Sequence, residues 1–528
     1  PTLSHLIWKA YDEGRVVDLM YYAQLVDIGS VGRLQRSYSL AAMSSRYLEL
    51  EVDKSEDTWR LRYAELLDVV DLDKWPSAAI DYAIDDVAIT DRLFSHLVDT
   101  FKSPITLEHQ CKAAFALHLA TAWGWRTNES YVRDLRKSLE FVSQEHRSVL
   151  QTYGIIRKNG TLDTKLVQEL AVQNGVTEKT PKGSVKITAD TLKNIDDVRF
   201  SHLRDWKKSQ KLLTTYLPVL ERAITEPVHP RYRVCVESGR TSCSGPNIQN
   251  LPRSGGIREA FEARPGRVLV AADYSVAELV CLAQVLYGLF GSNPLMDALK
   301  SGRDLHILTA ANMSGLSYED ALHRYESGDA QMKNSRQLAK ALSFGIPGGL
   351  GKTALPRYLK NFGIVVTEER AAFLRQQWLD SYPQVRLLFR HLSNKPKEFR
   401  LTHPDTGFKR GGLRFTSGAN HYFQHLGAFA GKEACYLVQR ACFDPNNPLY
   451  GARLIAFVHD ELIISCAETR IDHCAIELER LMIEGFSRGC PDVPVQVESV
   501  AMRRWYKDAK RVVDRRGSLQ VWRPSNLF

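Results

Sequence analysis

The sequence of 528 residues lacks several features that would assign it to a specialised class of protein. No uncharged apolar run approaches the roughly 18 residues that a membrane-spanning helix needs, and no signal-peptide pattern stands at the start. Internal repeats and low-complexity tracts are also absent. None of the nine cysteines forms a C-x-x-C pair, which disfavours a zinc site or a disulfide framework. We therefore expect a protein of a reducing compartment, such as the cytoplasm, that does not associate with membranes.

The composition is that of an ordinary globular protein, with 44% hydrophobic and 25% charged residues. The 70 basic residues exceed the 61 acidic ones, so the formal net charge is +9. This surplus agrees with a polyanionic partner but does not require one. At roughly 100–200 residues per domain, the length predicts three or four domains. Because the chain begins at Pro1 rather than Met, we expect it to be a piece of a longer product.

The pattern of apolar residues changes along the chain. Up to about residue 225 the spacing predicts helices, interrupted by a Pro- and Gly-containing loop at 177–190. Strand-like segments then follow: RYRVCVES (231–238), RVLVAADYS (267–275), RLIAFVHDELIISC (453–466) and PVQVESVAM (494–502). A second helical block, at about 290–395, separates the second and third of them. The sequence therefore predicts an α+β domain with a helical insertion.

Two aspartates occupy positions that favour metal binding. Asp273 ends a buried strand-like run, and Asp460 lies between two apolar runs that predict a hairpin with this residue at its tip. Carboxylates from two strands can converge on a pair of Mg²⁺ ions that supports phosphoryl transfer. In the alternative interpretation, Asp273 caps the following helix and Asp460 is an ordinary turn residue.

A basic helix supplies the complementary charge. Arg336, Lys340 and Phe344 follow each other at four-residue spacing, which places two cations and an aromatic ring on one helix face. Arginine grips phosphate oxygens as a fork, and lysine acts as a point charge. Pro347 and Gly348 then end the helix. The alternative is a solvated face with one core phenylalanine.

These segments resemble the motifs of a known family. AADYSVAELV, RQLAKALSFG and FVHDELIIS resemble the three polymerase motifs of family A DNA polymerases, in the family's order. ESGRTSCSGPNIQNLPR (237–253) is similar to a fourth element, IREAF (257–261) follows it, and the likeness is greatest to the bacteriophage branch. The resemblance implies a right-hand polymerase, with an antiparallel palm sheet and helical fingers and thumb, behind a partial RNase H-like 3′–5′ exonuclease domain.

The same resemblance divides the chain into five segments. It implies a partial exonuclease-like domain (1–100), a thumb (101–226), the first part of the palm (227–290), the fingers (291–410), and the second part of the palm with a basic C-terminal tail (411–528).

The resemblance also implies roles for individual residues. Asp273 and Asp460 would bind two Mg²⁺ ions, or Mn²⁺, while Glu461 and Lys340 would assist catalysis. Glu278 would exclude ribonucleotides by crowding the 2′ position. The residues expected to contact the dNTP are Arg336, Lys340, Phe344, His306, Glu278 and Tyr274. Those expected to contact primer–template DNA are Arg240, Asn247, Gln249, Asn420, Gln424 and His459.

Further basic residues suit binding to the DNA backbone. Lys207, Lys208 and Lys211 are interleaved with Trp206 in the expected thumb, and the tail adds five more cations. These tail residues are Arg503, Arg504, Lys507, Lys510 and Arg511, and we expect the segment after Trp505 to be an appendage. For any single lysine, a solvated amphipathic helix is an almost equal alternative.

Only a remnant of an exonuclease motif is present. Tyr82 and Asp86 fit the Y-x-x-x-D element of the family's exonuclease domain, but its D-x-E pair and its N-x-x-x-[FY]-D motif are missing. Two-metal hydrolysis needs several carboxylates, so we expect no proofreading from this chain, although a longer product could proofread. In the alternative, Tyr82 and Asp86 are plain helix residues.

Some positions depart from the family pattern near the expected base pair. Gly348 stands where the family has Tyr, and His425 where it has Gly. Val276-Ala277 replace Gln-Ile before Glu278, and Val280 replaces Arg. One hypothesis is that this altered pocket accommodates a noncanonical base such as diaminopurine.

Taken together, the sequence predicts a DNA-directed DNA polymerase that replicates phage DNA, as a monomer, in the cytoplasm of a bacterial host. A non-catalytic DNA-binding replication scaffold is the alternative. A nuclease without polymerase activity is disfavoured by the missing acids.

Overall fold

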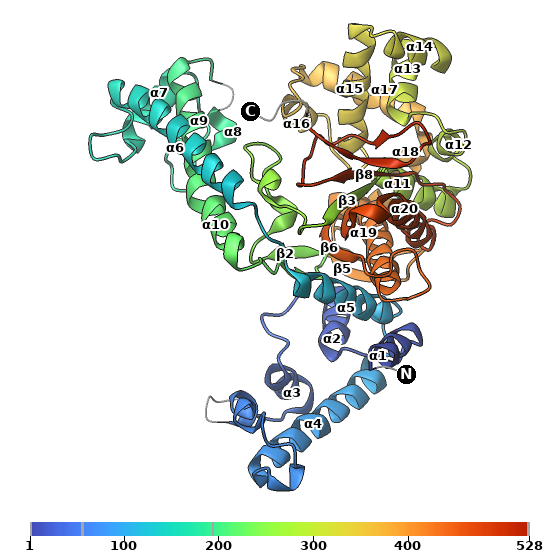
Figure 1. Ribbon diagram of the computed structural model, residues 1–528. Coiled ribbons are helices and arrows are strands. Elements are labelled where there is room, and N and C mark those ends of the chain that lie inside the picture. Colours follow the sequence, from blue (N-terminus) through green and yellow to red (C-terminus); the bar gives the residue numbers. More distant parts are fainter. Residues whose placement is uncertain (1–2, 54–57, 193–194, 525–528) are drawn as a thin grey trace.

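The computed structural model describes residues 3–53, 58–192 and 195–524. Figure 1 shows an N-terminal helical segment, an arm of helices to one side, and a body built around the largest sheet. No helix among the described residues is long and apolar enough to cross a membrane.

The N-terminal segment is helical, as the sequence predicts. Its elements are α1 (Leu3–Asp12), α2 (Leu19–Val31), α3 (Leu40–Leu48), η1 (Trp59–Leu61), η2 (Tyr63–Leu66), η3 (Leu72–Lys74) and α4 (Ser77–Phe101). Side-chain caps start two of the helices, because Asp18 accepts from the backbone of Met20 and Tyr21, and Ser39 accepts from Ala42. The described residues before 102 contain no strand. An RNase H-like origin of this segment therefore stays a prediction.

The arm consists of helices, of which those between residues 150 and 203 pack around a small core of their own, while residues 212–223 join a core that includes strands of the body. Its elements are α6 (Glu129–Thr152), α7 (Thr164–Gln173), α8 (Ala189–Leu192), α9 (Val198–Lys211), η4 (Leu212–Tyr216) and α10 (Leu217–Thr225). Leu150, Phe200 and Leu203 are buried between α6 and α9. The loop expected at 177–190 is confirmed up to residue 188, since α7 ends at Gln173 and α8 begins at Ala189. The preceding helix α5 (Leu107–Trp123) packs on the body instead, so the arm begins at α6.

The body contains a sheet whose central strand carries Asp273. In the described part of the chain, the strands lie in the order β6-β7-β3-β8-β10-β9. Their bounds are β3 (Arg267–Tyr274), β6 (Arg453–Val458), β7 (Glu461–Ala467), β8 (Val497–Met502), β9 (Val512–Val513) and β10 (Leu519–Trp522). Residues 268–272 of β3 are at most 2% exposed, because helices and loops cover both faces. The β8–β10 pair is parallel, so the expectation of an antiparallel sheet is wrong at this edge.

Two other expectations about this region need correction. The tail after Trp505 is not an appendage, because β9 and β10 extend the sheet and Trp505 itself is 0% exposed. The strand expected at 231–238 is short. It consists of β1 (Arg231–Arg233) paired with β2 (Ser242–Ser244), and an irregular loop joins them.

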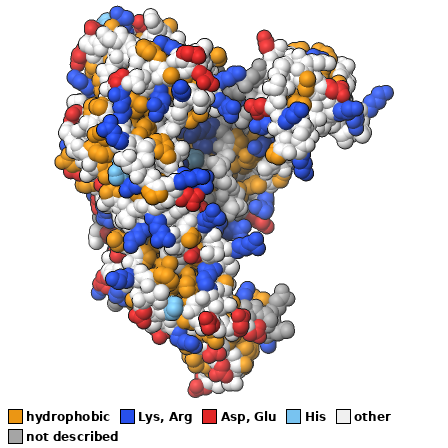
Figure 2. Space-filling view, turned by 180° about the vertical axis from the view of Figure 1, so that it is seen from behind, with side chains coloured by type: hydrophobic (Ala, Val, Ile, Leu, Met, Phe, Trp, Pro, Cys, Tyr) orange, Lys and Arg blue, Asp and Glu red, His pale blue; other side chains and the backbone are white. Residues whose placement is uncertain are grey.

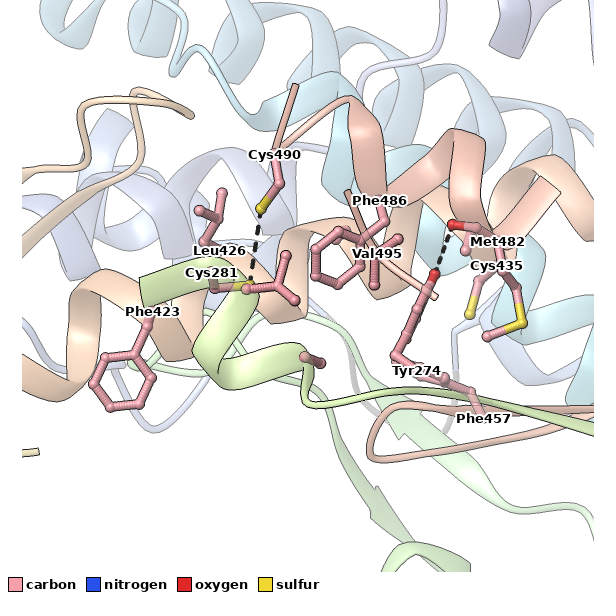
Figure 3. Close-up of a cluster of buried hydrophobic side chains, with 14 of the residues drawn as sticks. Tyr274, Cys281, Phe423, Leu426, Cys435, Phe457, Met482, Phe486, Cys490 and Val495 are labelled. Carbon is pink, nitrogen blue, oxygen red and sulfur yellow. Dashed lines mark hydrogen bonds between the residues drawn. The ribbon is translucent and has the colours of Figure 1, made fainter. Parts of the chain in front are cut away.

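Three helices pack together with the sheet. They are α11 (Ala277–Phe290), α19 (Phe415–Cys442) and α20 (Ile471–Ser487). Figure 3 shows the core that they share with the end of β3, where Tyr274 meets Phe486 and Met482 of α20. The close packing of α19 on α20 requires Gly485, since a Cβ there would lie 2.6 Å from the backbone nitrogen of Ala434.

The helical insertion lies between α11 and α19, as the sequence predicts. It comprises α12 (Pro294–Lys300), α13 (Leu305–Ser314), α14 (Tyr318–Glu326), α15 (Ala330–Gly345), α16 (Leu355–Lys360), α17 (Glu368–Ser381), α18 (Pro383–Ser393), β4 (Phe399–Thr402) and β5 (Lys409–Leu413). Asp329 caps α15 by accepting from the backbone of Gln331 and Met332. The helix ends just before Pro347, as expected.

Candidate functional site

A cleft of about 1020 Å³ lies where the end of β3, the β6–β7 turn, α11 and the insertion meet. Figure 2 shows Lys and Arg side chains along the hollow between the arm and the rest of the molecule. The residues predicted from sequence that line the cleft are Arg240, Gln249, Asp273, Tyr274, Glu278, His306, Arg336, Lys340, Phe344, Gln424, His459, Asp460 and Glu461.

The strand register brings the acidic residues together. Asp273 on β3 pairs directly with Glu461 on β7, and residues opposite each other in antiparallel strands have Cβ atoms about 4.5–5.5 Å apart. Asp460 immediately precedes Glu461 and lies in the tight turn between β6 and β7. Its neighbour His459 adopts a φ of 62°, which is uncommon for a residue other than glycine. The expected hairpin with Asp460 at its tip is therefore confirmed.

The three carboxylates concentrate negative charge at this end of the cleft, with Asp273 and Glu461 half-buried and Asp460 exposed. Burial, together with the charges of Asp460 and Glu461, raises the pKa of Asp273 to about 7, and the Lys507 ammonium opposes this rise. Burial also raises the pKa of Glu461. The Oδ1 atom of Asp273 is buried without a hydrogen-bond partner. A buried acceptor of this kind calls for a cation to balance it.

The donor set fits a divalent metal that is shared with a substrate. Among the residues that the structure describes, no group of three or more His, Cys, Asp or Glu side chains could hold a metal ion alone. Magnesium usually takes one or two protein carboxylates and completes its shell with water and substrate phosphates. Asp273 and Asp460 match that requirement.

The structure places Arg336, Lys340 and Phe344 on one face of α15, and one of the two cations already forms an ion pair within the protein. Arg336 donates from Nη2 to Oδ2 of Asp304 at 2.7 Å, and Asp304 also caps α13. Lys340 has no salt bridge within the described residues, and its Nζ lies 6.0 Å from the ring centre of Phe344. The Phe344 ring is 40% exposed. This face therefore offers the cleft a cation and an aromatic surface.

His306 faces the same part of the cleft as a neutral group. Its side chain is 4% exposed, and its ring centre lies 6.2 Å from that of Phe344. Burial lowers the pKa of His306 to about 4. Its Nδ1 atom is buried without a hydrogen-bond partner. The ring can therefore exchange a hydrogen bond with a ligand, but it carries no charge at neutral pH.

The comparisons with known proteins agree with this arrangement. The family model described as "DNA polymerase family A" matches residues 126–507, which is more than half of the chain. The chain belongs to this family. The match spans every motif from which the sequence predicted it, from 237–253 to Asp460.

Curated relatives are bacterial DNA polymerases I. The enzyme of Aquifex aeolicus is 29% identical over 387 residues, covering 71% of this chain and 64% of the relative. The thermostable enzyme of Thermus aquaticus is 28% identical over 457 residues, covering 78% and 50%. The chain thus spans about half to two thirds of these relatives. A bacteriophage origin stays a prediction.

A solved structure shares the fold. The POL domain of Pol1 from M. smegmatis, in complex with DNA primer-template and dNTP, aligns with a TM-score of 0.69 and 23% identity. The alignment covers 93% of this chain and 82% of that one. The palm, fingers and thumb arrangement of family A is therefore the fold of this chain.

One predicted nucleotide contact of this family A chain is corrected by the structure. The side chain of Tyr274 is 5% exposed, and its hydroxyl donates to the carbonyl of Met482 at 3.0 Å. Figure 3 shows the ring pointing into the core towards α20. Successive strand residues face opposite sides, so the same register that presents Asp273 turns Tyr274 inwards. We therefore expect no contact between the Tyr274 hydroxyl and a nucleotide.

The expected DNA-contacting residues divide into two groups. Gln249 and Gln424 line the cleft, with Gln249 donating to Thr241 at 2.9 Å. Asn247 and Asn420 are absent from its lining. Asn247 caps a short 3₁₀ turn by accepting from the backbone of Asn250, and Asn420 donates to the carbonyl of Gly348 at 3.1 Å. These two residues hold loops in place, so direct DNA contact by them stays a prediction.

Other predicted residues lie away from the cleft. Lys207, Lys208 and Lys211 are on α9 of the arm, and burial lowers the pKa of Lys207. Tyr82 and Asp86 are on α4 of the N-terminal segment. The structure places none of them among the residues that line the cleft.

The structure adds cleft residues to which sequence analysis assigned no role there. Arg253, Arg258 and Lys507 line the side that carries the carboxylates. Arg258 is 3% exposed, lies 4.4 Å above the Trp505 ring, and donates to the carbonyl of Leu251. Arg258 belongs to IREAF and Lys507 to the basic tail, but nothing in either segment predicted that it would face Glu461.

Other cations of the tail are held by the protein itself. Arg503 donates to Glu468 at 2.6 Å, and Arg511 donates to Glu479 at 2.5 Å. The expectation that the whole tail grips DNA is therefore too broad.

Proposed function

We propose that this chain is a DNA-directed DNA polymerase that adds dNTPs to the 3′ end of a primer. The observation that carries the proposal is the cleft that unites Asp273 and Asp460 on one side with Arg336 and Lys340 on the other. Negative charge that needs a metal thus faces positive charge that suits a triphosphate.

In this proposal, each side of the cleft has its own task. Asp273 and Asp460 would hold divalent cations, Mg²⁺ with Mn²⁺ as a substitute, which would supply ionisation of the primer hydroxyl and neutralisation of phosphate charge. Lys340 neutralises the triphosphate as the primer 3′-oxygen attacks the α-phosphate. Arg336 joins Lys340 after exchanging Asp304 for phosphate oxygens. Glu461 supports the carboxylate pair from β7.

The remaining cleft residues would position the nucleotide and the DNA. Phe344 packs on the incoming sugar, and His306 exchanges a hydrogen bond with the triphosphate. His459, beside Asp460, lies at the primer terminus. The lysines of α9 bind the DNA backbone on the arm, which serves as the thumb. The palm corresponds to 227–290 and 411–528, and the fingers to 291–410.

Two finer parts of the proposal rest on the sequence alone. Tyr82 and Asp86 are a remnant of a proofreading domain that a longer product would complete. Gly348 removes the aromatic ring that the family's Tyr would place near the template base, and we propose that the altered pocket admits a modified base during phage DNA replication. Insertion rates of dATP and its 2-amino analogue opposite T test the second point, and a 2-amino analogue inserted far less efficiently than dATP would contradict it.

The deciding experiment is primer extension in Mg²⁺ with the Asp460→Asn variant. The wild-type chain extends a primed template, whereas the variant binds the same DNA with unchanged affinity and does not extend it. Asp134→Asn, an exposed change on α6, is the control. Extension by Asp460→Asn at the wild-type rate would refute the assignment. Failure of the wild-type chain to extend, with DNA binding intact, would favour the non-catalytic scaffold.

A further inference from the structure

An ion pair bridges the cleft between two segments that are far apart in sequence. Arg240, in the loop between β1 and β2, donates from Nη2 to Oε1 of Glu278 in the first turn of α11 at 2.6 Å. The two side chains are 45% and 34% exposed, and both line the cleft. Burial raises the pKa of Glu278, and the Arg240 charge opposes that rise. The guanidinium therefore favours both the ionised form and a single orientation of this carboxylate.

A buried lysine supports the backbone beside Arg240. Lys432 on α19 is 1% exposed, and its Nζ donates to the carbonyl of Gly239 and to Oε1 of Gln110, each at 2.8 Å. Burial lowers the pKa of Lys432 to about 8. Both of these acceptors are neutral, so burial of this ammonium is costly and offers little stabilisation. A function in positioning the loop accounts for its presence.

The loop has little freedom at the point that Lys432 holds. Gly239 has a φ of 79°, which disfavours any side chain. A Cβ at this position would collide with the imidazole ring of His425, also on α19. Lys432 of α19 therefore holds the Gly239 carbonyl, His425 of α19 leaves no room for a side chain at this glycine, and Arg240 is the next residue.

We propose that Arg240 determines sugar selectivity by holding Glu278 in place, and that Lys432 is a positioning residue that places Arg240 through the Gly239 carbonyl. This inference rests on the proposed polymerase function, in which Glu278 faces the 2′ position of the nucleotide. A carboxylate fixed by a guanidinium excludes a 2′-hydroxyl by its volume. A carboxylate that is free to rotate can move aside or accept a hydrogen bond from that hydroxyl.

The experiment measures single-nucleotide insertion of matched dNTP and rNTP and compares the ratio of the two efficiencies. Because the ratio is internal to each variant, an equal loss of DNA binding cancels. Glu278→Ala and Arg240→Ala are each expected to reduce discrimination against rNTP about tenfold, a size that coupling between contacting residues commonly reaches. The double variant should discriminate no worse than Glu278→Ala alone. Arg240→Lys should restore part of the ratio.

Lys432→Met tests the positioning step, since it keeps the length of the side chain and removes its donor. It should reduce discrimination by a smaller factor, whereas loss of stability alone would leave the ratio unchanged. Arg15→Ala is the matched control, because Arg15 forms a 2.6 Å ion pair with Glu13 outside the cleft. That variant should keep the wild-type ratio.

The outcomes separate this inference from the proposed function. If the wild-type chain extends primers and Glu278→Ala loses discrimination while Arg240→Ala keeps it, the inference is overturned and the polymerase assignment stands. An unchanged ratio in Lys432→Met overturns the positioning role alone. Should Arg240→Ala be inactive with every nucleotide, Arg240→Met decides, because it keeps the length of the side chain and removes the guanidinium that holds Glu278. A wild-type ratio in that variant overturns the inference.

Discussion

At the scale of single residues, the carboxylate of Asp273 serves function at the expense of folding stability. Its Oδ1 atom is buried without a partner, and Asp460 and Glu461 add like charge. Without metal, Asp273→Asn should stabilise the protein by about 1–3 kcal/mol at pH 8, since it removes a buried charge. The folded-state pKa of Asp273 is raised to about 7. The free energy of unfolding therefore decreases as the pH rises from about 4 to 7, because the carboxyl ionises first in the unfolded chain.

Urea unfolding in the presence of a chelator measures this difference. The gain should be largest above pH 7 and should shrink towards pH 4, where the carboxyl is protonated in both states. Asp134→Asn, on the surface of α6, serves as the control without a gain. Equal stability of Asp273→Asn and wild type at pH 8 would count against the assigned charge crowding.

Gly348, where the family has Tyr, is closely packed against Asn420. A Cβ at position 348 would lie 2.7 Å from Oδ1 and 2.9 Å from Nδ2 of Asn420, whose Nδ2 donates to the Gly348 carbonyl. Gly348→Ala should therefore destabilise the protein by about 1–3 kcal/mol through overpacking. Addition of Asn420→Ala should recover most of that loss. Additive losses in thermal unfolding of the double variant would show that the two sites are independent.

At the scale of elements, the sequence predicted what depends on local pattern. The apolar run of β3, the β6–β7 hairpin around Asp460 and the end of α15 before Pro347 follow from alternation, turn residues and proline. The inward direction of Tyr274 was missed, because resemblance carries residue types but not the face on which each one lies. The ion pairs Arg240–Glu278 and Arg336–Asp304 join different elements, and a single sequence gives no information about such partners.

The ion pair that joins α13 to α15 leads to a prediction at this scale. Asp304 caps α13 and holds Arg336 of α15 at 2.7 Å, with side chains 32% and 26% exposed. Asp304→Asn keeps a good cap but removes the charge that competes with phosphate for Arg336. Such partly exposed pairs contribute up to about 1 kcal/mol, so the KM for dNTP should fall about threefold.

Steady-state primer extension measures this KM, and Asp329→Asn is the matched control because Asp329 caps α15 outside the cleft. An unchanged or higher KM for Asp304→Asn would mean that Arg336 does not exchange Asp304 for phosphate.

At the scale of the whole molecule, the division into a helical N-terminal segment, an arm and an α+β body was predictable because the residue pattern changes near 227. The final positions of α5, β9 and β10 were less predictable. Packing of α5 on the body and inclusion of β9 and β10 in the sheet depend on contacts between distant segments, which composition does not reveal. Such contacts also assemble a buried histidine cluster, consisting of His403, His421 and His425, where the β4–β5 turn meets α19.

This cluster should make the fold sensitive to acid. Burial lowers the pKa of His403 to about 4, that of His421 to about 3, and that of His425 well below 6.5. Among the groups that face the cluster, Arg410 and Lys432 oppose its protonation, His109 is neutral, and the Asp405 carboxylate lies 3.7 Å from Nδ1 of His403. Each imidazole then binds a proton more readily in the unfolded chain, so stability is full above pH 6.5 and falls as the pH drops towards 4.

Between pH 6.5 and 5.5 each imidazole should cost about 1 kcal/mol, and the three together about 3 kcal/mol, because the unfolded imidazole is already half-protonated at pH 6.5. Urea unfolding at a series of pH values measures the slope, and His421→Phe should reduce it by about a third because it removes one of the three groups. Both ring nitrogens of His421 are buried without partners, so this variant should also be at least as stable as wild type at pH 7.5. His473→Asn changes an exposed histidine and should leave the slope unchanged. If the unfolding free energy of His421→Phe changes with pH as steeply as that of wild type, His421 has the same pKa in the folded and the unfolded chain. Its burial against His403 and His425 would then have no energetic consequence.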